Sequence, residues 1–469
     1  MIIGIILVVA IIFRLVNINQ SLWLDEATQV LLSQKSLYSI FFERTADFHP
    51  PLSYVIYHFW MQISQTEIWL RSLSVVFGVL TVYLTYKLAL LIFNRWVAIT
   101  SSLLMAIAPY HIYYSQEIRM YSLAVFLSLL SVYFLVLQLR NGFKMMYKLG
   151  FILATATLIY THYMGLFLII ALLTYLFLQK KESLIKLLTQ FLIIILLYIP
   201  WLPQLIKQLQ GGVNVDSYLP HWREVLTLDL YKAVPLTIFK FSIGRIDFEN
   251  QTLYIVVAGL VLIIFGYLLI KGILILKDDE KILSFWFIIP IILSLVVSVK
   301  TPLFQPFRLL FIIPAFYLIL AGGIYQSARF RYLLLLVVIW VSLIGNIFYI
   351  FNSRFQREDW RGVSNFLQSR LNNDQIKVLS VWPEPFPPYE WYMNDKSALH
   401  MGSDLPYSYS EIDKSLNSVK FKEVYLLEYL QDLSDPNRLT QHWLEKNGYQ
   451  VKDIEDFRGV GFVYHYVKK

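Results

Sequence analysis

The sequence predicts a polytopic α-helical membrane protein that carries a small soluble α/β domain at its carboxyl-terminal end. Three observations lead to this fold class. Of the 469 residues, 57% are hydrophobic and only 15% are charged, whereas about a quarter of a soluble domain is charged. Apolar runs long enough to cross a bilayer recur as far as residue 351. From about residue 354 the sequence becomes charged and is punctuated by turns.

About eleven spans are expected, because a run of roughly 17 to 25 apolar residues is needed to cross the hydrocarbon. Residues 1–18 lack the basic start and the small-residue cleavage site of a signal peptide, so we expect them to remain as the first span. The candidate spans are residues 1–18, 66–93, 96–113, 117–139, 147–162, 163–179, 187–203, 251–270, 282–299, 305–325 and 332–351.

The charges of the short loops predict the orientation in the membrane, because lysine and arginine favour the cytoplasmic side. We therefore expect an integral protein of the plasma (inner) membrane whose amino terminus is cytoplasmic. The loop 19–65 and, with an odd number of spans, the segment 354–469 are then extracytoplasmic. The basic residues of alternate loops are Arg95; Arg140, Lys144 and Lys148; Lys180, Lys181 and Lys186; Lys271, Lys277 and Lys281; and Arg329 and Arg331.

Composition excludes several functional classes. The chain has no cysteine, which removes disulfides, thiolate metal sites and cysteine nucleophiles. Its formal net charge of +8 is typical of cytoplasmic anchoring residues in a membrane protein. No basic patch has the aromatic spacing of a nucleic-acid reader, and no glycine signature for a nucleotide is present. Neither a nucleic-acid partner nor a nucleotide cofactor is therefore expected.

The chain is expected to divide into a transmembrane module, 1–353, and an extracytoplasmic domain, 354–469. Within the first outer loop, 19–65, the stretches 27–40 and 51–63 are too short and too polar to span, and helical spacing of apolar residues predicts interfacial helices. A second long outer loop covers 204–250, with Gly211-Gly212 as its expected hinge.

The pattern of the domain 354–469 predicts a small α/β unit of ordinary size. Apolar residues at helical spacing predict helices around 363–367 and 439–444. Shorter apolar runs predict strands at 376–381, 424–427 and 461–467.

Asp25 and Glu26 follow the first span directly, after Trp23. A carboxylate at a shielded membrane surface can accept a proton from an alcohol if its pKa is suitable. The alternative is a structural role, in which Asp25 caps the helix that follows by accepting hydrogen bonds from its amides. The spacing alone leaves both interpretations open.

The segment Asp47-x-His49-Pro50-Pro51 is more specific. Two adjacent prolines fix the backbone and oppose a helix before them, so Asp47 and His49 point to the same side of an extended segment. Such a pair can hold a divalent cation (Mg²⁺, Mn²⁺ or Zn²⁺) or a phosphate. The alternative is a histidine that is merely satisfied by its neighbouring carboxylate.

Further ionisable residues fall at the outer ends of predicted spans. Glu67 and Arg71 are four residues apart, which predicts a helical ion pair. Ionisable residues such as Glu117 and Arg119 at the start of a span usually face a cavity of the bundle, and a guanidinium such as that of Arg119 binds phosphate bidentately. The remaining candidates at this face are His162, Tyr163 and Arg308.

Five motifs, taken in order over about residues 1–325, resemble those of bacterial glycosyltransferases of the GT-C fold, in the protein O-mannosyltransferase and aminoarabinose transferase group. They are Ser-Leu-Trp-Leu-Asp25-Glu26-Ala; Asp47-x-His49-Pro50-Pro51-Leu; Arg71-Ser-Leu-Ser with Phe77-Gly78; Pro109-x-His111-x-Tyr113-Tyr114-Ser-Gln-Glu117-x-Arg119-Met-Tyr121; and Thr161-His162-Tyr163.

The resemblance implies a polyprenyl-phosphate sugar donor, transfer at the outer face and a base carboxylate in the first outer loop, which Asp25 matches. Asp47 and His49 match the second motif of that loop. Glu117 lies where relatives place a further acidic or polar group. The outer carboxyl-terminal domain departs from the eukaryotic mannosyltransferases, so the acceptor is left open.

We therefore expect a glycosyltransferase that moves a hexosyl or pentosyl group onto a glycan, lipid or protein acceptor by one inverting displacement. A lipid-linked sugar transporter or flippase and a non-catalytic scaffold are the alternatives. Transporters often show inverted repeats and broken helices at the midplane, which the sequence lacks. The expected catalytic residues are Asp25, Glu26 and Glu117, and the expected substrate-binding residues are Asp47, His49, Arg71, Arg119, His162, Tyr163 and Arg308.

Overall fold

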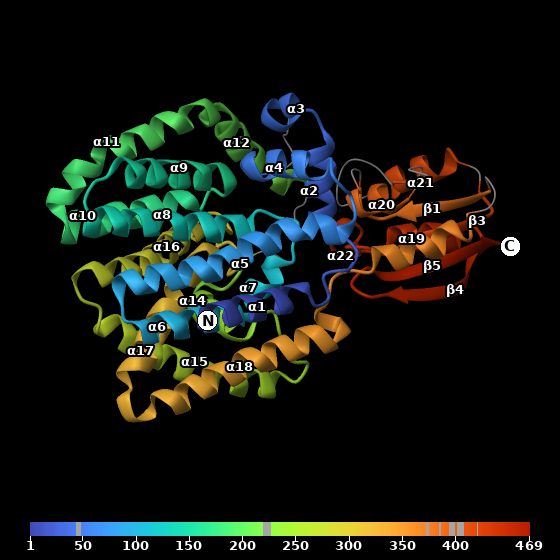
Figure 1. Ribbon diagram of the computed structural model, residues 1–469. Coiled ribbons are helices and arrows are strands. Elements are labelled where there is room, and N and C mark those ends of the chain that lie inside the picture. Colours follow the sequence, from blue (N-terminus) through green and yellow to red (C-terminus); the bar gives the residue numbers. More distant parts are fainter. Residues whose placement is uncertain are drawn as a thin grey trace.

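The computed structural model describes residues 1–43, 48–218, 227–371, 375–383, 386–393, 399–400, 408–419 and 421–469. A bundle of helices forms the larger part of the molecule, and a sheet domain lies at one end of it (Figure 1). The carboxyl terminus lies in this sheet domain, so the charged segment of the sequence forms a separate layer beyond the apolar helices.

Helices of the bundle follow the apolar runs of the sequence. They are α1 (Ile2–Leu15), α5 (Glu67–Ile92), α6 (Arg95–Ala106), α7 (Pro109–Ser115), α8 (Tyr121–Asn141), α9 (Met145–Thr161), α10 (Gly165–Gln179), α11 (Lys181–Tyr198), α15 (Gln251–Leu274), α16 (Ile282–Ser298), α17 (Ile313–Gln326) and α18 (Arg331–Phe351). Short 3₁₀ turns join some of them: η1 (Ile199–Trp201), η2 (Asp278–Lys281), η3 (Leu310–Ile312), η4 (Ala328–Phe330) and η5 (Ser353–Phe355).

Within the described residues, six helices are long and apolar enough to cross a membrane, and α6 with α7, bent by 57°, makes a seventh candidate. Four shorter apolar helices occupy further predicted ranges. The prediction of a polytopic helical membrane protein with a carboxyl-terminal sheet domain is confirmed, whereas the number of eleven spans stays a prediction. Helix α17 is buried on all sides from Ile313 to Ile324, as expected of a helix that is apolar all round.

The first outer loop contains three short helices, α2 (Leu24–Gln34), α3 (Leu37–Phe42) and α4 (Leu52–Trp60). Two predicted helical stretches, 27–40 and 51–63, are therefore confirmed as helical, although the first is broken between α2 and α3. Helix α4 begins directly after Pro50-Pro51, in agreement with the restriction that proline places on the preceding backbone. Ser36 caps α3 by accepting a hydrogen bond from the amide of Ser39.

The segment 204–250 is largely helical where it is described. Helix α12 (Leu202–Tyr218) runs through Gly211 and Gly212, so the prediction of a hinge at this pair is wrong. Helix α14 (Leu230–Ile243) packs against α7, α15 and α18. A Cβ atom at Gly345 of α18 would lie 2.2 Å from the carbonyl oxygen of Ile243, so glycine permits the close approach of α18 to α14.

The carboxyl-terminal domain, called the outer domain after its predicted orientation, is a five-stranded mixed sheet with the strand order β2-β1-β3-β5-β4. Strands β1 and β2 and strands β1 and β3 pair in parallel, while β5 pairs antiparallel with both β3 and β4. The strands are β1 (Ile376–Ser380), β2 (Leu399–His400), β3 (Glu423–Leu427), β4 (Tyr449–Phe457) and β5 (Gly461–Lys468). The helices are α19 (Trp360–Gln368), α20 (Pro387–Tyr392), α21 (Tyr409–Asn417), α22 (Gln431–Ser434) and α23 (Leu439–Lys446).

The helices and strands predicted for this domain all occur. Successive residues of β3 alternate between two separate apolar cores, with Val424 and Leu426 in one and Tyr425 and Leu427 in the other, as the period of a strand requires. Strand β4 was not predicted. It lies at the sheet edge, is mostly exposed and carries charged side chains, which protect an edge from pairing with other chains.

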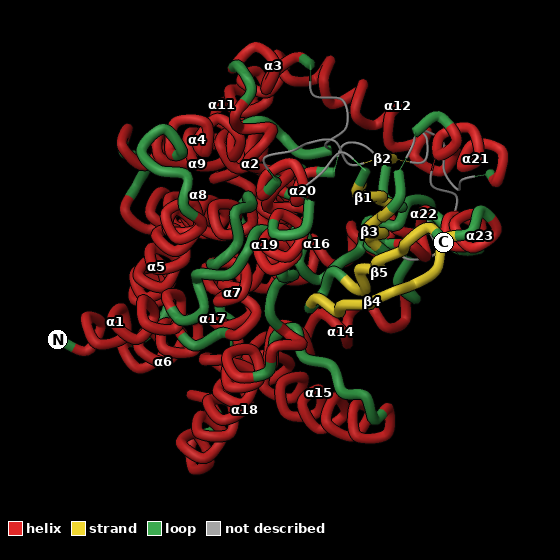
Figure 2. Tube along the Cα trace, turned by 90° about the vertical axis from the view of Figure 1, so that its right-hand side faces the viewer, coloured by secondary structure: helices red, strands yellow, loops and turns green. Residues whose placement is uncertain are grey.

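The outer domain docks on the first outer loop. Helix α20 packs against α2, and Figure 2 shows both helices where this domain meets the bundle. The hydroxyl of Tyr392 accepts a hydrogen bond from the amide of Leu22 (2.7 Å) and donates one to Glu67 (3.0 Å). Ser21 donates a hydrogen bond to the carbonyl of Glu358 (2.6 Å). The outer domain thereby holds the segment that directly precedes Asp25.

Candidate active site

A cavity of about 280 Å³ lies between the loop 19–65, the predicted first outer loop, and the ends of several helices of the bundle. Its lining combines carboxylates, cations and aromatic rings, which suits a ligand with both charged and apolar parts. The lining residues are Trp23, Asp25, Tyr110, Tyr114, Glu117, Tyr121, Leu236, Lys240, Arg245, Gln305, Pro306 and Phe307.

Asp25 occupies the first turn of α2, where the positive end of the helix dipole favours a carboxylate. Helix α2 begins at Leu24, and its N-cap residue Trp23 makes no side-chain cap hydrogen bond. Asp25 is therefore not the N-cap residue that the structural alternative required. Its half-buried side chain lines the cavity and makes no hydrogen bond or ion pair with any residue that the structure describes.

Glu26 points away from this cavity into a fully buried ion pair with Arg71. Two nitrogens of Arg71 donate to the two carboxylate oxygens at 3.0 and 2.5 Å, and the amide of Ile118 donates to the same carboxylate at 2.9 Å. Burial alone would raise the pKa of Glu26, but the charges of Arg357 and Arg71 hold it below its ordinary value. Glu26 is thus placed to fix the loop.

Arg71 completes this fixation through the backbone of residues 18–21. It donates to the carbonyls of Ile18 (2.8 Å), Ser21 (3.0 Å) and Gln20. The predicted helical pair of Arg71 with Glu67 is wrong, because Glu67 instead binds Tyr392 and, at 3.2 Å, Arg361 of the outer domain. Glu67 and Arg71 therefore each bind residues that are distant in the sequence and do not pair with each other.

Glu117 is the second carboxylate of the cavity. It lies in the connection between α7 and α8, outside the helix Tyr121–Asn141, and Ser74 holds this connection by donating to the carbonyl of Glu117 at 2.6 Å. Burial raises the pKa of Glu117 to about 7, although the charge of Arg357 opposes the shift. Its two carboxylate oxygens are buried and accept no hydrogen bond from described residues.

Arg357 was missed by the sequence interpretation, because it lies just beyond the last span, far from the motifs. Its guanidinium is only 1% exposed and lies 3.6 Å from Glu117 and 3.9 Å from Glu26. It also donates to the carbonyls of Tyr113 and Gln116. The positive charge of Arg357, near the start of the outer domain, thus offsets the negative charges of Glu26 and Glu117.

Two further cations of the cavity were also missed. Arg245 stacks over the ring of Tyr113 at 4.5 Å and donates to its hydroxyl at 2.5 Å, and Arg357 stacks over the same ring at 4.5 Å. Lys240 donates to the carbonyl of Ile246 at 3.1 Å. Both Lys240 and Arg245 come from the segment 204–250. The only sequence signal for them was the tyrosine-rich motif around Tyr113, because tyrosine rings can stack with cations.

The predicted phosphate-binding arginines lie around the cavity. Arg119 is buried and donates to the carbonyl of Asp25 at 3.4 Å. Arg308 is half-buried, directly follows the cavity residue Phe307 and donates to the carbonyls of Pro302 and Leu303. The structure therefore brings Arg119 close to Asp25 and Arg308 close to Phe307. Arg71 does not line the cavity and instead binds Glu26 and the backbone of residues 18–21.

A row of rings leads from the cavity toward the second motif of the loop. The ring of Tyr121 lies 6.0 Å from that of His162, which lies 6.1 Å from that of His49. Burial lowers the pKa of His162 to about 3, so its ring is neutral, and its buried Nε2 has no partner among the described residues. Tyr163 binds Gln208 of α12, which donates to the carbonyl of His49 at 3.5 Å.

Asp47, the predicted partner of His49, lies outside the described residues. Among those that are described, no group of three or more His, Asp or Glu side chains is arranged to hold a metal ion. The predicted metal ligation by Asp47 and His49 therefore stays a prediction.

Comparisons with known proteins agree with the motifs. Residues 48–206 match the sequence model of the dolichyl-phosphate-mannose-protein mannosyltransferase family. None of the curated proteins matches the chain. ArnT from Cupriavidus metallidurans in the apo state has a similar structure, with a TM-score of 0.61, 11% identity, and coverage of 99% of this chain and 97% of ArnT.

Two further structures are similar. ArnT from the same organism bound to undecaprenyl phosphate has a TM-score of 0.60 and 13% identity, with coverage of 99% and 97%. The Archaeoglobus fulgidus oligosaccharyltransferase AglB, in complex with an inhibitory peptide and a dolichol-phosphate, has a TM-score of 0.56 and 12% identity, with coverage of 98% of this chain and 74% of AglB. The fold is shared, and the resemblance that the motifs predicted is confirmed.

Proposed function

We propose that the protein is a membrane glycosyltransferase that moves a sugar from a polyprenyl-phosphate donor to an acceptor hydroxyl at the outer face of the membrane. One observation carries this proposal: Asp25 lines the same cavity as Lys240 and Arg245. A base for the acceptor and cations for a phosphate leaving group are thus available around one space. The similar structures of ArnT and AglB with bound polyprenyl phosphates support the donor class.

In the proposed reaction, the acceptor oxygen attacks the anomeric carbon of the donor and forms the new glycosidic bond. The bond between that carbon and the phosphate oxygen breaks, and polyprenyl phosphate leaves with the electron pair. The proton of the acceptor hydroxyl passes to the Asp25 carboxylate. A single displacement of this kind inverts the configuration at the anomeric carbon.

The cations around the cavity are proposed to stabilise the negative charge that grows on the phosphate, which is commonly the largest catalytic contribution. Arg245 and Lys240 line the cavity itself, and Arg119 and Arg308 lie beside it. Glu117 is proposed to position the acceptor or the sugar. Glu26, Arg71 and Arg357 are assigned positioning roles, because their buried side chains contact other protein groups.

A divalent cation is a further part of the proposal. The rings of His49 and His162 lie 6.1 Å apart, and an imidazole such as that of His49 is a ligand type that Mn²⁺ and Zn²⁺ accept. Nδ1 of His162 accepts a hydrogen bond from the amide of Met164 at 3.2 Å, so the Nε2 of the neutral ring carries the proton and can donate to a phosphate oxygen. Asp47 and His49 would hold the ion beside the donor phosphate, whose charge it would neutralise. Transfer that persists in full after exhaustive chelation would leave these residues with a hydrogen-bonding role toward the phosphate.

The orientation proposed from the loop charges puts the amino terminus in the cytoplasm and the outer domain outside the plasma (inner) membrane. The function is tested by deleting the protein and analysing the polyprenyl-linked sugars of the membrane. One lipid-linked sugar should accumulate in the deletion strain and return to its normal level when the protein is restored. An unchanged set of lipid-linked sugars would contradict the proposed function.

A further inference from the structure

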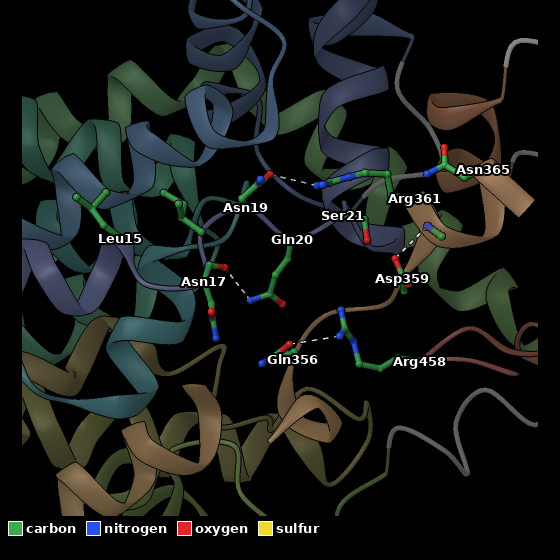
Figure 3. Close-up of a pocket in the computed structure, with 12 residues that line it drawn as sticks. Leu15, Asn17, Asn19, Gln20, Ser21, Gln356, Asp359, Arg361, Asn365 and Arg458 are labelled. Carbon is green, nitrogen blue, oxygen red and sulfur yellow. Dashed lines mark hydrogen bonds between the residues drawn. The ribbon is translucent and has the colours of Figure 1, made fainter. Parts of the chain in front are cut away.

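A second cavity, of about 610 Å³, lies between the link from α1 to α2 and the outer domain. Figure 3 shows its lining side chains, which come from residues 15–21, from the start of the outer domain and from the turn before β5. Polar groups dominate this lining. They include the amides of Asn19, Gln356 and Asn365, the guanidinium groups of Arg361 and Arg458, and the carboxylate of Asp359.

Hydrogen bonds hold the walls of this cavity in place. Asn17 adopts a left-handed backbone conformation (φ 59°), which asparagine tolerates, and its side chain donates to the carbonyl of Ile350 at 2.9 Å. Asp359 caps α19 by accepting from the amide of Gly362 at 3.0 Å. A Cβ atom at Gly362 would lie 2.4 Å from the Asp359 carboxylate, so a larger residue would displace this cap. The cavity is therefore preformed.

Several polar groups of the lining have unused hydrogen-bonding capacity. Arg361 donates to Asn19 at 3.3 Å, as Figure 3 shows, but its buried Nε has no partner in the described part of the chain. Gln356 is engaged at both ends of its amide, because it accepts from Arg458 at 3.3 Å and donates to the carbonyl of Ile350 at 3.0 Å. The amide nitrogen of Asn19, by contrast, donates to no residue that the structure describes. Asn365 is exposed on α19, within the lining.

The mixture of groups selects a class of ligand. An amide offers a donor and an acceptor side by side, and a hydroxyl is likewise both donor and acceptor, so clustered amides match vicinal hydroxyls. The charges of the site balance, because Glu67 pairs with Arg361 at 3.2 Å and Asp359 offsets Arg458, so there is no excess positive charge to select a phosphate. Among the described lining residues there is also no aromatic ring on which a nucleobase could stack. The volume lies within the range of roughly 300–1,000 Å³ that is usual for small-ligand sites.

We propose that this cavity, walled by Asn19, Asn365 and Arg361, is a carbohydrate-binding site distinct from the cavity that contains Asp25. Its ligand is a neutral glycan segment of a few sugar units. Arg357 lies between the two sites: its side chain offsets the charges of Glu26 and Glu117, while its carbonyl accepts from Arg458 and its amide donates to Gln20, both of which line the second cavity. This site does not depend on the proposed transfer reaction, since glycan binding can be measured without a donor.

The test is direct binding of the neutral trisaccharides maltotriose, mannotriose and triacetylchitotriose to the full-length protein. The protein is purified in a detergent without a sugar head group, because a maltoside would compete. Asn365→Leu removes one amide from an exposed position, where it should not disturb folding. Asn417→Leu, at an exposed residue of α21 remote from the cavity, is the matched control, and Asp25→Asn probes the other cavity.

At least one trisaccharide should bind saturably in the millimolar range. Asn365→Leu should weaken this binding about tenfold, the equivalent of one lost hydrogen bond of roughly 1.4 kcal/mol, while Asn417→Leu and Asp25→Asn leave it unchanged. Absence of saturable binding would overturn the proposal. Binding that is lost in Asp25→Asn but kept in Asn365→Leu would also overturn it, as would a site that takes glycerol phosphate and no trisaccharide.

Discussion

The substitution Glu26→Gln tests whether the Glu26–Arg71 pair holds the first outer loop. Both side chains are at most 1% exposed, and the pair contains two charge-assisted hydrogen bonds. Glutamine keeps the shape of Glu26 but removes the charge that Arg71 needs. Leaving one charge of a buried pair uncompensated typically costs about 3 to 5 kcal/mol, so we expect a loss of this size in the free energy of unfolding.

Equilibrium unfolding in mixed micelles measures this loss, with Glu182→Gln as the matched control. Glu182 is an exposed carboxylate in the first turn of α11, and its substitution should change the stability by no more than about 0.5 kcal/mol. The double variant Glu26→Gln/Arg71→Met removes both charges but leaves three carbonyls without their donor. It should be less destabilised than the sum of the single variants by about 1 to 3 kcal/mol. Wild-type stability of Glu26→Gln would refute the reasoning.

Three other predictions concern the cavity and the topology. Arg119→Lys keeps the charge but loses the planar fork, so it should weaken donor use in a transfer assay; equal donor affinity would reject a phosphate role. The pKa of Glu117 is raised to about 7 in the folded protein. The stability that its protonated form contributes should therefore be lost as the pH rises from about 4.5 to 7, by at most about 1.4 kcal/mol per pH unit. Glu117→Gln should flatten this pH dependence of the free energy of unfolding. A reporter fused after Lys469 that requires the extracytoplasmic compartment should be active, and activity of a cytoplasmic reporter there would disprove the orientation.

The sequence was sufficient for most of the architecture because the signals are local. Each apolar run became a helix of the bundle, since hydrophobic length alone determines which segments suit a membrane. The proline pair before α4 and the spacing of its apolar residues predicted this short helix in the same way. The hinge expected at Gly211 failed because helix α12 tolerates glycine within it, a cost of about 1 kcal/mol per residue that packing can offset.

Most of the site residues that were predicted belong to the motifs, Arg308 being an exception. Asp25 and Glu117 were found in this way, but the pairing of Arg71 was not, since its partner Glu26 lies 45 positions away in the sequence. Arg245 and Arg357 reach Tyr113 from 132 and 244 positions away. No periodicity relates residues at such separations, so only the packing of α7, α14 and the outer domain could bring these cations together.

The proton acceptor is the central claim, and one measurement tests it most directly. A deletion strain is complemented with either the wild type or Asp25→Asn at equal membrane abundance, and the accumulated lipid-linked sugar is followed as it is consumed. The asparagine preserves the shape of the side chain at the start of α2, so the protein should assemble normally. The account predicts that consumption slows on the order of a hundredfold or more, the scale of general-base catalysis. Consumption by Asp25→Asn at a rate close to that of the wild type would contradict it.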